Sequence, residues 1–304
     1  MSGKCSAARA LSVLDLTCSA QNVLNKRTMS NISTSLILLL LGASNAFGGA
    51  VGVNLGTAGS FAVLAASTVT NTGNTVLVGS LGVTPGTAIT GFGPGIVTEG
   101  TTYTGGPVVA AAENDLMAAY NFAAGEVCTA ADNLSGDNLG GLTLTPGVYC
   151  FSSSAALTGT LTLNAQGDPN AVFVFQVMSA LTVAGNSSLI LTDDAQGGNV
   201  FWQVGSSATL GTDAALQGAI LAYSSITLNT GASLTCGSAM AMNGAVTLDS
   251  NTVSACAVPE PGSGWLLSGA LLLGLMAGCR EATRVIRGGR MQVVCATHGE
   301  PEPQ

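Results

Sequence analysis

Positive charge is almost absent from the interior of this 304-residue chain, in which only 8% of the residues are charged. All eight Lys and Arg residues lie before Thr28 or after Cys279, and the single histidine is His298. Because proteins bind nucleic acid phosphates mainly through Lys and Arg, nucleic acid is excluded as a partner of the long segment between these ends. Histidine-dependent catalytic triads and histidine-rich metal sites are excluded there as well.

Aromatic residues are also few, at 5%, whereas glycine is abundant, with 41 residues. The hydrophobic fraction of 47% is too high for a disordered chain, and charged helix-forming residues are too few for a coiled coil. The rest of the composition is rich in Gly, Thr, Ser, Ala and Val, which favours a mainly β protein.

An apolar run, Ser35–Ala43, lies near the start of the chain, with Lys26 and Arg27 before it. The small residues of Ser44-Asn45-Ala46 follow in the form that signal peptidase cleaves. A transmembrane helix is the alternative, but the run is shorter than the roughly 20 residues needed to span a bilayer. We therefore expect residues 1–46 to be a leader and signal peptide, and the protein to be extracellular or at the cell surface.

The other end of the chain contains Pro259-Glu260-Pro261, then an apolar segment at 265–278, then the Arg cluster that ends at Arg290. This order resembles the PEP-CTERM sorting signal of bacteria that use an exosortase. The resemblance implies that exosortase cleaves near the triplet and that the chain contacts a membrane only through this segment before processing. We assign 259–290 to the signal and leave the tail, 291–304, unassigned. A plain C-terminal anchor is the alternative, for which the apolar segment is short.

The body, residues 47–258, repeats a Thr between two apolar residues, as in Leu181-Thr182-Val183. The members of this column are Thr162, Thr182, Thr209, Thr227 and Thr247. Two further apolar segments recur around each member, which predicts three short strands in each repeat of about 20 residues. Such a pattern is typical of a β-solenoid, in which alternation along the strand sends Leu and Val inward and Thr outward.

One of the recurring segments is apolar on both faces, as in Val172–Val177 and Val200–Val204, so its outer face must be covered. The segment Pro107–Gly125 can cover it, because it is rich in Ala, begins with Pro and has no interior Gly. Its apolar residues at helical spacing are Val108, Ala112, Leu116, Ala119 and Phe122. We expect one long helix along one face of the solenoid, with Glu113 elsewhere on the helix.

Four of the cysteines lie in the body. Cys236 and Cys256 occupy equivalent positions in successive repeats, which places them about 4.8 Å apart on adjacent strands, within the reach of a disulfide. Cys128 and Cys150 are the other pair, and a second disulfide is expected in an oxidising compartment. Spacing alone does not prove this connectivity, and metal ligation is the alternative, although no Cys-X-X-Cys motif occurs.

Six segments spread over nearly the whole body add a family pattern. They are Asn54–Ser67, Val69–Gly73, Leu142–Tyr149, Gln166–Phe173, Asn199–Ser206 and Gly244–Asp249. Together they resemble the secreted microbial ice-binding proteins. The resemblance implies a mainly β fold, a right-handed discontinuous β-solenoid with one long α-helix packed along one face, in which residues before the helix join coils made after it. It also implies that the partner is the surface of an ice crystal.

The outward Thr column is the expected ice-binding surface. Stacked strands repeat at about 4.8 Å, close to an oxygen repeat of ice, and the β-branched Thr side chain is stiff, so methyl and hydroxyl groups form a preorganised array. A solvated ladder without ice affinity is the alternative, which would make the protein a cell-surface adhesin or matrix protein on the same scaffold. A rival face carries Ser188, Ala215, Ser233 and Thr235.

Enzyme and metal functions find little support in the body. The adjacent pair Asp193 and Asp194 is reminiscent of the paired carboxylates of polysaccharide hydrolases, but adjacent strand residues point to opposite faces. Asp132 and Asp137 do not have the spacing of a known calcium loop. We expect no catalytic site, no cofactor and no metal.

Overall fold

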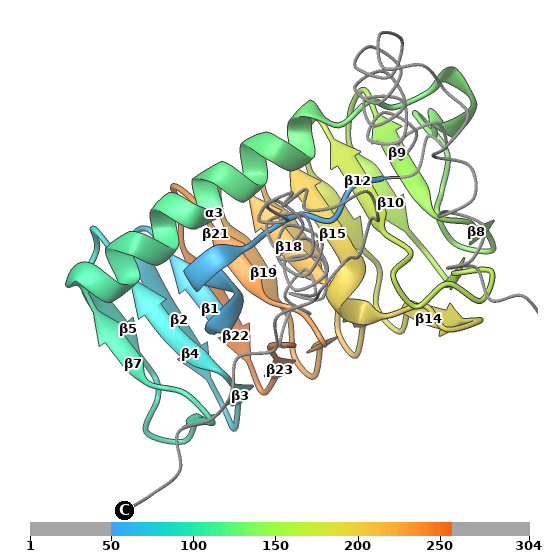
Figure 1. Ribbon diagram of the computed structural model, residues 1–304. Helices are drawn as coiled ribbons and strands as arrows, with labels where there is room; N and C mark the ends of the chain where they lie inside the picture. Colours follow the sequence, from blue (N-terminus) through green and yellow to red (C-terminus); the bar gives the residue numbers. More distant parts are fainter. Residues whose placement is uncertain (1–49, 257–304) are drawn as a thin grey trace, which may run out of the picture. The chain divides into compact units, whose positions relative to one another are not determined.

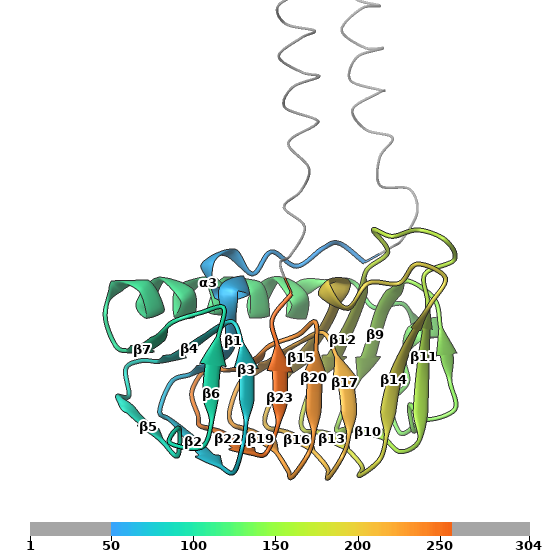
Figure 2. The ribbon, with the colours of Figure 1, turned by 90° about the horizontal axis from the view of Figure 1, so that it is seen from below.

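The computed structural model describes residues 50–256, which form three parallel β-sheets wound into a solenoid, with one long helix beside them (Figures 1 and 2). The expected signal peptide (1–46), sorting signal (259–290) and tail (291–304) lie outside the described residues. Within the described part of the chain, no helix is both long and apolar enough to cross a membrane.

Successive strands enter the three sheets in turn, so each coil of the solenoid adds one strand to each sheet. Sheet A contains, in spatial order, β7 (Thr102–Thr104), β4 (Ser80–Val83), β1 (Phe61–Ala65), β21 (Ala239–Ala241), β18 (Ala219–Ala222), β15 (Val200–Val204), β12 (Phe173–Val177) and β9 (Gly147–Phe151). Sheet B contains β10 (Ala155–Leu157), β13 (Leu181–Val183), β16 (Ala208–Leu210), β19 (Ile226–Leu228), β22 (Val246–Asp249), β2 (Thr68–Thr72) and β5 (Ala88–Thr90). Sheet C contains β6 (Ile96–Thr98), β3 (Val76–Val78), β23 (Thr252–Ser254), β20 (Ser233–Thr235), β17 (Ala215–Gln217), β14 (Ser188–Thr192), β11 (Thr160–Asn164) and β8 (Thr143–Leu144).

The chain path through the stack is discontinuous, as the family resemblance implied. In sheet B, β2 lies between β22 and β5, and Thr70 of β2 pairs with Thr247 of β22. In sheet A, β1 likewise pairs with β21. The strands formed before the helix therefore continue the stack beyond the last strands of the chain, which confirms the discontinuous solenoid.

The interior is filled by the inward side chains of strands that alternate along their length. In β13, Leu181 and Val183 are fully buried on either side of the exposed Thr182. In sheet A the inward aromatic residues Phe175 and Trp202 stack on adjacent strands, with ring centroids 4.0 Å apart. The stack runs from one coil to the next, because in-register pairing places equivalent side chains of adjacent strands in contact.

The helix α3 (Pro107–Gly125) lies along the outer face of sheet A and buries the strands that are apolar on both faces (Figure 1). Its buried residues are Val109, Ala112, Leu116, Ala119 and Ala123. The helix itself is confirmed, but two of the expected core residues were wrong, since Val108 and Phe122 are 48% and 43% exposed. Which residues of the helix are buried depends on the side chains of sheet A that pack against it, such as Phe201 and Met240. The sequence of the helix by itself does not reveal these contacts.

Three short 3-10 helices complete the elements, η2 (Gly56–Ser60), η3 (Ala130–Asp132) and η4 (Gly197–Asn199). The first of these is attached to the middle of α3, because Asp115 accepts hydrogen bonds from the backbone N–H and the hydroxyl of Thr57, at 2.7 and 2.6 Å. These bonds hold the pKa of the Asp115 carboxyl below its usual value.

Two disulfides connect the pairs that the sequence indicated. Cys128, just after α3, is bonded to Cys150 of β9, with Cα atoms 6.0 Å apart. Cys236 follows β20 and is bonded to Cys256, one coil further along, with Cα atoms 4.4 Å apart. One bond therefore attaches the end of the helix to the solenoid, and the other joins two neighbouring coils.

Loss of the second disulfide is expected to destabilise the fold without changing its surface. The bond closes a loop across 20 residues, for which unfolded-chain entropy predicts a contribution of about 3 kcal/mol. The double variant Cys236→Ser/Cys256→Ser should lower the unfolding free energy in urea by about that amount. An unchanged urea midpoint would show that the bond adds nothing to folding stability.

Candidate functional site

Four of the five candidate threonines form one straight file on the outer face of sheet B. Thr182 pairs with Thr209, Thr209 with Thr227 and Thr227 with Thr247, each directly across adjacent parallel strands. All four are exposed or half-exposed, whereas their neighbours along each strand are buried. Adjacent strands in a sheet lie about 4.8 Å apart, so the file repeats at that interval.

The placement of Thr162 in this file was wrong. Thr162 lies on β11 of sheet C, where it pairs with Ile190 and Thr143. The residue that pairs with Thr182 in the preceding coil is Ala156 of β10. The sequences around Ala156 and Thr162 both alternate apolar and small residues, and they lie only six residues apart, so repeat spacing did not distinguish the two sheets.

Two members of the file were missed because they precede the helix in the sequence. Thr70 pairs with Thr247, and Thr90 pairs with Thr70, which extends the file to β2 and β5. Both are exposed, and the hydroxyl of Thr90 lies 3.5 Å from that of Thr70. The apolar residues Val69 and Ile89 beside them show the same alternation as the other strands of the file. The sequence did not reveal, however, which strands lie next to each other in the sheet.

We call the outer surface of sheet B the B face. The residues two positions before the threonines border this face, on the strand itself in β2 and β5 and in the turn that enters the strand in the other coils. They are all small: Ala180, Ser207, Ser225, Ala245, Thr68 and Ala88. The backbone N–H of Ser225 donates to the Ser207 hydroxyl at 3.4 Å, and that of Ala245 donates to the Ser225 hydroxyl at 3.2 Å. The serine hydroxyls thus connect the turns of neighbouring coils.

Bulky side chains distinguish the rival face, the outer surface of sheet C. Its column of small residues, Ser188, Ala215 and Ser233, continues through Thr252 into Val76 and Ile96. Ile96 and Ile190 are 51% and 48% exposed there. Among the described residues, no large apolar side chain that is strongly exposed lies on a strand of sheet B. The B face is therefore the more uniform of the two.

The B face has the properties of a surface that orders water. Its threonine file presents methyls and hydroxyls on stiff side chains held at a fixed interval by the sheet, and Thr72 and Asp249 lie beside one end of it, two positions after Thr70 and Thr247. Residues 50–256 contain no Lys, Arg or His, so no mobile, strongly hydrated cation disturbs the layer of water against it. A rigid array of this kind matches a flat and periodic partner rather than a small molecule.

A sequence model of the ice-binding-like family matches residues 63–254. The chain belongs to this family. An ice-binding protein of Nostoc sp. (strain HG1) is 53% identical over 240 residues, which span 76% of this chain and 87% of that protein.

Solved structures of ice-binding proteins share the fold. One from an Antarctic biological consortium superposes with a TM-score of 0.64 at 45% sequence identity, covering 67% of this chain and 91% of that chain. Another, from the Antarctic ascomycete Antarctomyces psychrotrophicus, gives a TM-score of 0.65 at 40% identity, covering 68% of this chain and 100% of that chain. These relatives are named as binding proteins and not as enzymes, which agrees with the expectation that this chain is not an enzyme.

The acidic residues that suggested other functions have structural roles in this ice-binding-like fold. Asp193 and Asp194 both have positive φ, 50° and 67°, and so form the turn after β14. Asp193 accepts a hydrogen bond from the side chain of Asn164, and Asp132 accepts one from the hydroxyl of Thr129. In the described part of the chain, no three His, Cys, Asp or Glu residues are grouped so as to hold a metal ion.

Proposed function

We propose that the protein binds ice through the B face. The observation that carries this proposal is the unbroken file of Thr182, Thr209, Thr227, Thr247, Thr70 and Thr90 across six in-register strands. A threonine array preorganised by the sheet loses little side-chain entropy when water orders against it. The name of the Nostoc relative, an ice-binding protein, supports the same function.

An ice recrystallisation assay tests the proposal. Micromolar protein in a frozen sucrose film should slow the coarsening of ice crystals, because bound protein prevents water from joining the faces of growing crystals. Unslowed growth would contradict it. That outcome would favour the alternative, a cell-surface adhesin or matrix protein that uses the same scaffold without ice affinity.

We also propose that the protein acts outside the cell. In this proposal signal peptidase removes 1–46, exosortase recognises the PEP-CTERM-like segment 259–290, and residues 47–258 form the mature domain. Two disulfides within residues 50–256 support an oxidising compartment. Such processing would place an ice-binding domain at the cell surface or in the surrounding medium.

The mass of the mature protein is expected to reveal this processing. In a bacterium with an exosortase, the recovered protein should lack residues 1–46 and the apolar segment 265–278. Replacing Pro259, Glu260 and Pro261 with Ala should leave the C-terminal segment attached, since the triplet is the recognition element. Wild-type protein recovered with 265–278 still attached would contradict the sorting proposal, and the ice assay is independent of it.

A further inference from the structure

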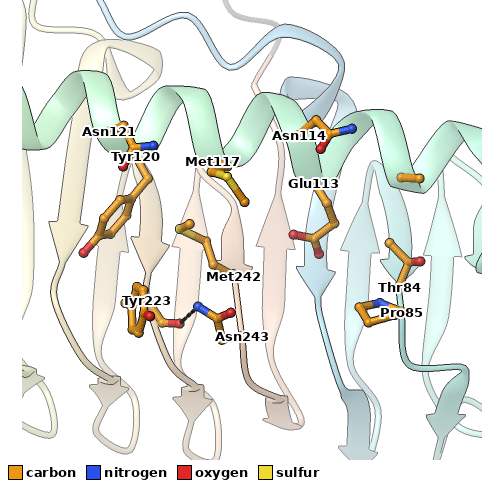
Figure 3. Close-up of a pocket in the computed structure, with 11 residues that line it drawn as sticks. Thr84, Pro85, Glu113, Asn114, Met117, Tyr120, Asn121, Tyr223, Met242 and Asn243 are labelled. Carbon is orange, nitrogen blue, oxygen red and sulfur yellow. Dashed lines mark hydrogen bonds between the residues drawn. The ribbon is translucent and has the colours of Figure 1, made fainter.

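A groove with a volume of about 500 Å3 lies between α3 and the turns that follow strands of sheet A (Figure 3). The helix contributes Glu113, Met117 and Tyr120 to its lining, and the turns after β18 and β21 contribute Tyr223 and Asn243. The helix lies on the sheet A side of the solenoid, away from the strands of sheet B (Figure 2). Its volume is within the range typical of small-molecule sites.

Glu113 gives the groove an unsatisfied acceptor. Its side chain extends from α3 toward the sheet (Figure 3), and its Oε1 is buried without a hydrogen-bond partner among the described residues. Burial raises the pKa of the Glu113 carboxyl to about 7. No Lys, Arg or His in residues 50–256 compensates the charge of this carboxyl, so a bound cation would stabilise its ionised form.

Aromatic and thioether groups line the rest of the groove, where the two methionines lie between Glu113 and the tyrosines (Figure 3). The rings of Tyr120 and Tyr223 lie 6.3 Å apart between centroids, with planes inclined at 48°. Tyr223 and Met117 are 49% and 52% exposed, and the side chain of Met242 faces Met117 across the groove (Figure 3). The Asn243 side chain donates to the carbonyl oxygen of Tyr223 at 3.0 Å, which holds the two turns together. Aromatic faces attract cations, and flexible, polarisable Met side chains pack against alkyl groups.

We propose that this groove binds a small organic cation, a primary alkylammonium group whose N–H groups reach Glu113 and whose carbons contact Tyr120, Tyr223 and the two methionines. Anions are disfavoured, because residues 50–256 contain carboxylates and no cationic side chain. A neutral alcohol or sugar of similar size can donate a hydrogen bond to Glu113, but it does not supply the charge that compensates a buried carboxylate. The proposal is independent of ice binding.

Butylammonium chloride is a suitable probe for the full-length protein. The methyl NMR signals of Met117 and Met242, assigned with Met→Leu variants, should shift saturably, with a Kd of about 1 mM for so small a ligand. Glu113→Gln keeps the size of the side chain but removes its charge, and should raise the Kd at least about tenfold. The matched control is Glu99→Gln, which removes a carboxylate from an exposed turn and should leave the Kd unchanged.

The binding should also strengthen as the pH rises. The cation pairs with the charged carboxylate, so below a pKa of about 7 the affinity should fall, approaching a tenfold loss for each pH unit. The other titratable groups that line the groove are Tyr120 and Tyr223, and burial raises the pKa of the Tyr120 phenol. The turns with Thr84 and Asn243 bring no titratable group. Asp115, on the same helix, is bonded to Thr57 instead.

Four results would overturn the proposal. They are the absence of a saturable shift at Met117 and Met242, equal binding of the neutral analogue 1-pentanol, binding of glucose without binding of butylammonium, and an affinity that Glu113→Gln leaves unchanged. A melting curve of each variant shows whether the fold is retained, and Tyr223→Leu gives a second test that leaves Glu113 in place. Because Tyr223 is half-exposed, its replacement should weaken binding without unfolding the protein.

Discussion

Thr227→Tyr is expected to abolish most of the ice recrystallisation inhibition while leaving the fold intact. Thr227 is in the middle of the file, with Thr209 on one side and Thr247 on the other. A phenol ring projecting from a half-exposed position would hold an ice surface away from the neighbouring methyls and hydroxyls. We expect the concentration needed for inhibition to rise about tenfold or more, since each tenfold step corresponds to only about 1.4 kcal/mol of affinity.

Thr235→Tyr is the matched control for this variant. Thr235 is exposed on β20 of sheet C, in the same coil as Thr227 of β19. The same substitution there changes a different face of the solenoid and should leave the inhibition unchanged. Equal losses in the two variants, or full activity in Thr227→Tyr with an unchanged melting temperature, would contradict the B face as the ice-binding surface.

Trp202→Ala is expected to cause the largest loss of stability. Trp202 is fully buried, its ring is stacked on Phe175 at 4.0 Å, and its indole N–H donates to the carbonyl oxygen of Gln217 at 3.0 Å. Removal of a buried Trp leaves a cavity in a close-packed core and costs about 3–5 kcal/mol. The fall in the urea midpoint, at an unchanged slope, measures this loss.

Trp202→Phe separates the two contributions of this side chain. The phenyl ring retains most of the stacking on Phe175 but leaves the carbonyl oxygen of Gln217 without the indole donor. We expect a smaller loss of about 1–2 kcal/mol. A loss below about 1 kcal/mol in Trp202→Ala would show that the core relaxes around the missing ring, and that the aromatic stack is not central to the stability of the solenoid.

The elements of this fold were readable from local patterns. Alternation of apolar and small residues predicted the strands of sheets B and C, as at Leu181-Thr182-Val183. Strands that are apolar on both faces, such as Val200–Val204, required a cover, and the Ala-rich segment Pro107–Gly125 supplied it. These predictions succeeded because side-chain alternation in a strand and the absence of Gly in a helix are properties of neighbouring residues.

The candidate site was only partly readable for a different physical reason. Membership of the Thr file depends on which strand lies beside which, and parallel neighbours are far apart in the chain, as Thr70 and Thr247 show. Thr162 has the expected local pattern but lies on another sheet, because the lengths of the turns decide where each strand falls around the coil. The groove beside Glu113 was not expected at all, since it is formed by turns of distant strands closing against one helix.

The sequence by itself determined a β-solenoid with short repeats and no cationic side chain, one covering helix and two cysteine pairs. Each of these features follows from composition or from patterns among residues that are near one another in the chain. The family resemblance implied that the coils before the helix join later ones, but only the tertiary structure showed that they stack beyond Val246–Asp249, which lengthens the threonine file at one end while Ala156 interrupts it at the other. The tertiary structure also decided which side of α3 is buried, and thereby placed the carboxyl of Glu113 in a groove. Both outcomes depend on side chains that meet only when the chain is folded.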